Sequence, residues 1–470
     1  MRADRASARA LWRATSVLAL GLAAPAVLAQ ETTPTAPAQP TAPGPLAQAA
    51  TDLGLDLTQP LNLQQCTALM IAAHPNVAAA LAQLQASQAS LEAARAALFP
   101  TLDFQADYTT TQQAARQVQT GGTIITVSGG KFTNQNQTVT LSYVFWRTGR
   151  DEPIAQARHY LEAAEAGQRD TERLLEFGVA QAFFNLLAAR RLDDVAREQV
   201  ASWEEHIKMV QAQIDAGSAA PVDIHTVRAS LAQARLSLIQ ADNAVASNQA
   251  QLQAALGSAR EAVNVQGDFA PPSGMLLLDE AQSLALENRP DLQEAAANIA
   301  ASELSVRLAR LGTQPNFNIT GEAQYGRYSG LLSHTWTLFG QVTYPIFDGN
   351  QGRSQVKQAK ANLAAQKAQL DASRNTVLVN VQTQWLAIRE AAESIASTQE
   401  AVAEARAALD AATGRYQANR GIILEVTDAQ LALNQAEVSA VQALYNYHTA
   451  DAALTEAIGG LAVRTVGPPE

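Results

Sequence analysis

The stretch from Gln351 to Gly459 contains no proline and consists mostly of Ala, Gln, Leu, Val and Glu. Such a composition favours helix. Large apolar residues recur at every seventh position, with one four-residue step, in the order Val356, Leu363, Leu370, Val377, Val381, Ile388, Ile395, Val402, Leu409 and Tyr416. This spacing predicts a coiled-coil seam that contains a stutter. A helix over residues 353–412 alone would be about 90 Å long, far beyond the diameter of a globular domain.

A second helix is predicted after a break at about 413–421 in the same stretch. It covers residues 422–458 and carries a seam of its own through Leu424, Leu431, Val438 and Tyr445. The two helices therefore form a very long helical hairpin over about 351–458.

The hairpin pattern occurs twice. Shifting the numbering by 202 places residues 154–257 on 356–459 without a gap, and the seam residues coincide except that Asp193 aligns with Ile395. Shifting it by 215 places residues 61–107 on 276–322. Self-similarity of this kind predicts an internal duplication. Each copy consists of a helix, two strands and a helical hairpin, and the chain divides into a first structural repeat at 61–258, an inter-repeat segment at 259–275, a second structural repeat at 276–459 and a C-terminal tail at 460–470.

Two short regions in each repeat alternate apolar and polar residues, as with Leu102, Phe104 and Tyr108. A period of two is typical of strands, which we predict at about 101–111, 136–146, 316–326 and 335–346. The loop at 112–135 receives no prediction. An apolar face, a polar face and aromatic strand ends are together typical of a transmembrane β-barrel. The alternative is a small soluble hairpin domain that packs one face on a core.

Four strands from one chain cannot close a barrel, and an open sheet edge is not tolerated in lipid. Known barrels begin at about eight strands, so two or more chains must each contribute four. Three chains with twelve strands is the preferred arrangement.

Residues 1–29 have the pattern of a secretory signal peptide. Four arginines precede an apolar run from Val17 to Leu28, and small residues end at Ala29. The run is too short for the alternative, a membrane-anchoring helix. Its removal leaves 29 basic and 43 acidic side chains, a net charge of −14 that disfavours nucleic-acid binding. Residues 30–60 are rich in Pro, Ala and Thr and are predicted to form a linker without fixed structure.

The order of these elements, together with three short motifs, resembles that of the TolC-type outer-membrane efflux proteins. The motifs are Arg289-Pro290-Asp291-Leu292, the run from Tyr344 to Gly349, and Arg415-Tyr416 with the run from Leu424 to Gln430. The resemblance covers nearly all of the chain after residue 60. It implies an α+β membrane protein, a homotrimer with a twelve-stranded outer-membrane β-barrel, four strands per chain, continued by a long periplasmic α-helical coiled-coil barrel. It also implies three partners: outer-membrane lipid, a periplasmic adaptor protein and an inner-membrane pump of the RND, ABC or a similar class.

The sequence contains no recognisable catalytic motif. It lacks a Gly-rich phosphate loop, a G-x-S-x-G nucleophile elbow and an H-E-x-x-H zinc motif. The six histidines are scattered, and the lone cysteine, Cys66, excludes an intrachain disulfide and is predicted to be an ordinary helix residue. We therefore expect no catalytic residues, no cofactor and no metal site.

The candidate site lies at the turns of the two hairpins, 215–223 and 417–425, which form the end of the tunnel farthest from the barrel. Glu425 and Asp428 are three residues apart and share one face of a helix. In three copies they would form two carboxylate rings, which suit a cation-selective constriction. The resemblance implies that these positions are the acidic aperture rings of the family. The alternative is that both are solvated acids beside a positive helix terminus.

The resemblance also implies that polar contacts between the two hairpin ends hold the aperture closed. Asp223 and Tyr416 stand at matching positions, and the basic residue often used in that lock aligns with Gly421. Its neighbour Arg420 therefore becomes the predicted partner of Asp223. The turn positions at which the family meets adaptor tips are matched by Gly217, Ser218, Asn419 and Arg420.

The predicted function is passive conduction through a gated channel-tunnel that serves tripartite efflux or type I secretion. The alternative is a structural envelope protein in which long helices tether the outer membrane to deeper layers. A tether has no need for two matched hairpins or for stacked acids at their turns.

Overall fold

The computed structural model describes residues 45–460 apart from 121, 128, 148, 259–260, 262, 268–275 and 329–330. All of these residues belong to one unit, Pro43–Glu470. The predicted signal peptide, residues 30–44 of the predicted linker, most of the inter-repeat segment and the tail after Gly460 lie outside the described residues.

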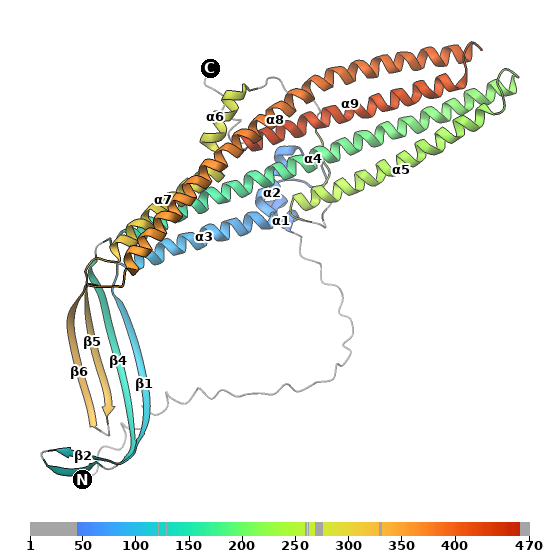
Figure 1. The fold of residues 1–470 in the computed structure, drawn as a ribbon. Coiled ribbons are helices and arrows are strands. Elements are labelled where there is room, and N and C mark those ends of the chain that lie inside the picture. The colour runs from blue at the N-terminus through green and yellow to red at the C-terminus, as the bar shows by residue number, and fades with distance from the viewer. Residues whose placement is uncertain are drawn as a thin grey trace, which may run out of the picture. The chain divides into compact units, whose positions relative to one another are not determined.

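Four long strands form one antiparallel sheet (Figure 1). They lie in the order β1 (Thr101–Gln113), β4 (Gly130–Arg147), β5 (Asn316–Tyr328) and β6 (Leu331–Thr343). All four predicted strands are present. β1, β4 and β5 are longer than predicted because pairing continues into polar residues that show no alternation, and β6 begins and ends earlier. Within the region that received no prediction, β2 (Arg116–Thr120) pairs with β3 (Thr123–Val127) in a separate sheet.

Apolar side chains gather on one face of the four-stranded sheet. The register aligns Phe104 with Val139, and Val139 in turn with Ala323, which pairs with Trp336. Phe104 is 69% exposed and Trp336 is 79% exposed. A soluble hairpin domain would bury such a face, so that alternative is not supported. β1 and β6 each pair with one neighbour in this sheet, which leaves two open edges.

Each strand of this sheet connects directly to one long helix. α3 (Pro75–Ala96) precedes β1, α4 (Glu152–Asp215) follows β4, α7 (Pro290–Leu311) precedes β5 and α8 (Gln351–Gln417) follows β6. α3 packs on α4, α4 on α7 and α7 on α8, so the helices keep the order of the strands. Proline stands in the first turn of α3, α4 and α7, where its missing N–H costs no hydrogen bond.

Two helical hairpins make up the rest of the helical part. α4 has 64 residues and α8 has 67, which correspond to lengths of about 95 and 100 Å. α5 (Asp223–Ala255) returns along α4, α9 (Ile423–Ala457) returns along α8, and α4 also packs on α9. Figure 1 shows the four helices side by side, with α5 and α8 outermost.

The predicted seam of α8 is confirmed by burial. Leu370, Val377, Val381 and Ile388 are all buried, including both residues of the four-residue step. A stutter keeps the apolar face toward its neighbours where a strict seven-residue repeat would drift away from them.

The predicted seam of α9 is wrong. Leu424 and Leu431 are 53% and 52% exposed, whereas Thr427, Gln430 and Asn434 are buried. The buried face of α9 also carries Val426, Leu433, Tyr447 and Leu454, which are spaced by multiples of seven residues. The buried seam is therefore displaced by two residues from the predicted one, and hydrogen-bonded polar residues lie beside it.

The prediction of a linker without fixed structure is wrong for residues 45–60. α1 (Pro45–Asp52) buries Leu46 and Ala50, which are 0% and 2% exposed, in a core with Cys66 and Phe183. Cys66 lies in α2 (Leu63–Ala73) as an ordinary helix residue, and burial raises the pKa of its thiol to about 12. Among the described helices, none alone is long and apolar enough to cross a bilayer; α2 and α3 together, bent by 50°, meet that measure by length and composition.

The Arg289-Pro290-Asp291-Leu292 motif anchors the start of α7, just after α6 (Leu278–Asn288), to the end of α9. The buried Arg289 guanidinium donates to the Asp291 carboxylate at 3.0 and 2.9 Å and to the carbonyl of Ala457 at 3.1 Å. Burial opposes ionisation of Asp291, yet the hydrogen bonds and charge of Arg289 hold the pKa of its carboxyl below the usual value. The motif therefore serves as a structural tie between the start of α7 and the end of α9.

Candidate functional site

Both hairpin turns begin with the same kind of helix end. Gly217 after α4 has a φ of 73°, and Asn419 after α8 has a φ of 57°. The amide of the next residue, Ser218, donates to a carbonyl five residues back at 2.9 Å, and the Arg420 amide does the same at 2.8 Å. These are Schellman motifs, in which a left-handed residue reverses the chain and satisfies the last helix carbonyls. Glycine and asparagine adopt that conformation at the least cost.

The ends of the two hairpins share one hydrophobic core. It contains Trp203 and Val210 from α4, Val227 from α5, Tyr416 from α8 and Val426 from α9, each at most 4% exposed. Burial of this amount of apolar surface holds the two turns together within a single chain. The turns therefore form one structural unit.

Tyr416 lies in this core close to Asp223. Its hydroxyl oxygen is buried and has no hydrogen-bond partner among the described residues. Burial raises the pKa of the phenol, and the negative charge of Asp223 raises it further. The carbonyl of Tyr416 accepts a hydrogen bond from Gln213 Nε2 at 3.1 Å, which joins α8 to α4. The two residues predicted from matching positions are thus brought together, without a hydrogen bond between them.

The predicted pair of Asp223 with Arg420 is not formed within the described chain. Arg415 instead donates to Glu425 Oε2 from Nε at 3.2 Å and from Nη2 at 3.1 Å. The Schellman turn after α8 brings the end of that helix against the start of α9, so Arg415 faces Glu425 across the turn. Both side chains are about half exposed, and an ion pair of this kind contributes little to stability.

Glu425 and Asp428 lie on one exposed face at the start of α9, as their spacing predicts. Between them, Val426 and Thr427 are buried, and Val426 belongs to the shared core. The two carboxylates therefore point away from the neighbouring hairpin of the same chain. Gly217, Ser218, Asn419 and Arg420 are likewise exposed at the turns.

A buried polar network joins α4 to α9 within two helical turns of Asp428. Gln430 Oε1 accepts from Ser202 Oγ at 2.7 Å and lies 3.1 Å from His206 Nε2, and Gln430 Nε2 donates to Asn434 Oδ1 at 3.0 Å. Gln430 is 3% exposed, Asn434 7% and His206 8%. No sequence motif predicts this network, because Ser202 and His206 on α4 are separated from Gln430 on α9 by more than 220 residues.

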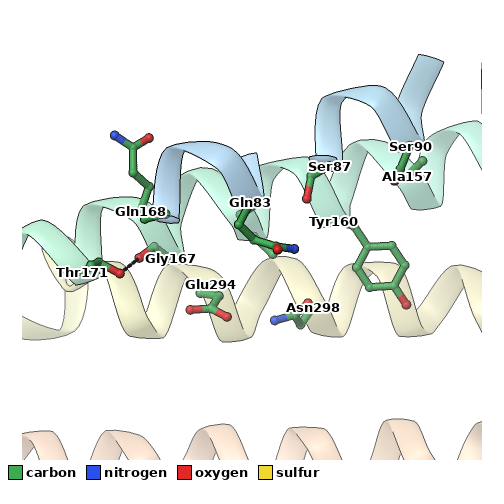
Figure 2. A pocket seen from close by; sticks show the side chains of 13 residues that line it. Gln83, Ser87, Ser90, Ala157, Tyr160, Gly167, Gln168, Thr171, Glu294 and Asn298 are labelled. Carbon is green, nitrogen blue, oxygen red and sulfur yellow. Dashed lines mark hydrogen bonds between the residues drawn. The ribbon is translucent and has the colours of Figure 1, made fainter. Parts of the chain in front are cut away.

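A hollow of about 550 Å³ lies far from the turns, between α3, α4 and α7. Figure 2 shows the side chains that line it, among them Ser87 from α3, Tyr160 and Thr171 from α4, and Glu294 and Asn298 from α7. Burial raises the pKa of Glu294, with the charges of Asp170 and Asp291 adding to the effect. Within the described residues, no three His, Cys, Asp or Glu side chains gather as metal ligands would.

A comparison of the sequence with protein families identifies the family to which the chain belongs. The model for outer membrane efflux proteins matches residues 68–258 and 281–460, well over half of the chain. The chain belongs to the outer membrane efflux protein family. The efflux protein is therefore located in the outer membrane, and it belongs to a family of channels, not of enzymes.

Known relatives agree with this assignment. The efflux protein is 26% identical to the pyoverdine export outer membrane protein OpmQ of Pseudomonas aeruginosa over 398 residues, which cover 82% of each chain. The structure of CusC superimposes with a TM-score of 0.74 at 18% identity, over 85% of this chain and 92% of that chain. For VceC of Vibrio cholerae the TM-score is 0.72 at 19% identity, over 85% and 96%. The efflux protein thus shares the fold of these outer-membrane proteins, mostly helical with a small sheet.

Proposed function

We propose that the efflux protein is a homotrimeric channel-tunnel that passively conducts cargo from the periplasm to the exterior. The observation that carries this proposal is the sheet, which has two open edges and an uncovered apolar face. In lipid, an open edge leaves backbone groups without partners, and closure between chains removes both edges. Three copies of the four-stranded sheet supply twelve strands, within the range of known outer-membrane barrels.

The helical hairpins supply the periplasmic part of the duct. Since each strand continues into one helix in the same order, a closed ring of strands is accompanied by a closed ring of helices. An internal duplication underlies this arrangement. In support of it, the 202-residue shift relates Gly217 to Asn419 and Gly257 to Gly459, and all four positions have a positive φ after a helix end.

The aperture of this duct lies at the hairpin turns. In three copies, Glu425 and Asp428 form two carboxylate rings that favour cations. The shared core around Tyr416 and Asp223 holds the turns closed, and separation of the two hairpins opens them. An inner-membrane pump supplies energy for efflux or type I secretion, and a periplasmic adaptor binds the exposed turns near Gly217, Ser218, Asn419 and Arg420 to bias them toward opening.

The test begins with the native mass of the protein extracted from envelopes in mild detergent, corrected for bound detergent. A mass of three chains supports the closed barrel, and channel recordings in planar bilayers then measure conductance. A trimer that conducts nothing in any state would favour the tether, in which long helices link envelope layers. A monomer would leave the sheet edges open and remove the barrel.

A further inference from the structure

The α4–α9 contact within one chain provides a template for a contact between chains. Ser202 and His206 of α4 both lie against Gln430 of α9, with Oγ and Nε2 at 2.7 and 3.1 Å from its Oε1. Gln430 and its neighbours Thr427 and Asn434 are buried by this contact.

The 202-residue shift relates the two residues of this α4–α9 contact to two charged residues on α8 and α5. It places Ser202 on Glu404 of α8 and Gln430 on Arg228 of α5. Arg228 and Glu404 are both exposed in the single chain, and neither has an ion-pair partner among the described residues. A neutral hydrogen-bonded pair in the template thus corresponds to two opposite charges without partners.

The rest of the same face follows the pattern. Thr427 and Asn434, buried on α9, correspond to His225 and Ala232, which are exposed on α5. Further along α5, Ile239 is 65% exposed. Ile239 and Arg228 thus lie uncovered on one face of α5, because a single chain does not contain the helix that would cover this face.

The order of the elements places the missing partner on the next copy. α4 is flanked by α7 and α9 on the side of α8, and by α3 and α5 on the other side. β6 and α8 therefore occupy one flank of the chain, and β1, α3 and α5 occupy the opposite flank. Closing the open sheet edges by joining β6 to β1 of the next copy brings α8 toward α5 of that copy.

We infer that Arg228 of each chain forms an ion pair with Glu404 of the adjacent copy, in a contact between α5 and α8 that repeats the internal contact between α9 and α4. This inference rests on the proposed homotrimer and names its contact in the half of the tunnel that carries the turns. The pairing is heterologous, because α5 meets α8 and not another α5. A heterologous contact generates a ring when its rotation closes, as three copies require. If two copies docked in the reverse orientation, residues of like charge would face each other and repel. The ion pair therefore also selects the orientation in which the copies dock.

The test is chemical crosslinking of two cysteines in the full-length protein in outer membranes. Arg228→Cys and Glu404→Cys are introduced together, and a short bismaleimide is added before denaturing electrophoresis. The matched control replaces Glu404→Cys by Arg406→Cys, two residues along α8 and so on the opposite face of the helix. Arg406 is exposed and its Nη2 donates to Glu437 of α9 in the same chain at 2.9 Å, so it faces away from the proposed contact. The native Cys66 is 0% exposed and does not react in the folded protein, which the single variants verify.

The expected result is a covalent trimer as the main product for the Glu404 pair, with the control pair remaining monomeric. The native mass is measured on the same preparations. A trimeric mass without crosslinking, or with equal crosslinking of the control, overturns the Arg228–Glu404 contact and leaves the proposed trimer standing. A ladder that stops at covalent dimers overturns the ring. A monomeric mass overturns the contact and the proposed trimer together.

Discussion

Replacement of Gln430 by leucine tests how the two hairpins are held together. Gln430 is 3% exposed and contacts Ser202 and His206 on α4 and Asn434 on α9 through hydrogen bonds of 2.7 to 3.1 Å. Leucine nearly preserves the volume and removes every one of these bonds. The buried His206 and Asn434 then lose this partner while they remain shielded from water, and the half-buried Ser202 loses it as well.

The magnitude follows from the number of groups left unpaired. Each buried donor or acceptor without a partner costs about 1 to 3 kcal/mol, and the lower value for the two buried groups gives about 2 kcal/mol. Because this network lies between α4 and α9, the closed arrangement of the hairpins bears the cost, whereas separated hairpins expose the groups to water. A change of about 2 kcal/mol raises the equilibrium constant for separation by roughly thirtyfold.

The assay is the leak current of purified protein in planar bilayers, recorded without an adaptor. Gln435→Leu is the matched control, because Gln435 lies on the same helix, is exposed and bonds only to Ser439 within the described residues. We expect Gln430→Leu to increase the open fraction strongly and Gln435→Leu to leave it unchanged. Equal leak currents for the two variants would refute the reasoning that this network holds the hairpins closed.

Three further predictions concern other residues. Asp428→Asn should weaken cation selectivity, seen as a smaller reversal potential in a salt gradient; an unchanged potential removes Asp428 from the aperture. Tyr416→Phe deletes a buried hydroxyl without a partner in the described chain, so it should stabilise the shared core by about 1 kcal/mol and lower the leak; a higher leak would mean that another copy bonds this hydroxyl. Asp291→Asn should lower stability at neutral pH by removing the carboxylate held by Arg289. The folded pKa of Asp291 is lowered, so its contribution is complete above the unfolded value of about 4 and is lost as pH falls through the folded value. The unfolding free energies of wild type and Asp291→Asn should therefore converge in acid, and a constant difference would contradict this assignment.

Periodicity predicts the long elements of this protein well. The seam of α8 repeats over many turns, so one residue that breaks the pattern does not change the predicted buried face. Val377 and Val381, the two residues of the predicted stutter, are both buried. The strands are equally evident, because a sheet with one apolar and one polar face must alternate.

Features that depend on contacts between distant segments could not be predicted. The buried face of α9 carries Thr427, Gln430 and Asn434, which count as polar in any hydrophobic pattern. Gln430 is held by Ser202 and His206 on α4, whereas Thr427 and Asn434 form hydrogen bonds within α9. α1 lies in a segment whose prolines indicate a linker, and only its contacts with α2 and the surrounding core reveal it as a packed helix. At the turns, the spacing of Glu425 and Asp428 predicts a shared face, but the pairing of Glu425 with Arg415 depends on the geometry of the Schellman turn.

The uncovered apolar face of the sheet has a consequence for biogenesis. A newly exported chain carries Phe104 and Trp336 in contact with water, beside two strand edges able to pair with any other strand. Such a surface promotes aggregation until it is covered. Neither half of the chain alone supplies the whole sheet, because β1 and β4 precede α4, whereas β5 and β6 follow α7. In the proposed trimer, both strand pairs must therefore be exported before assembly can begin, and the supply of further copies then sets how long this surface stays uncovered.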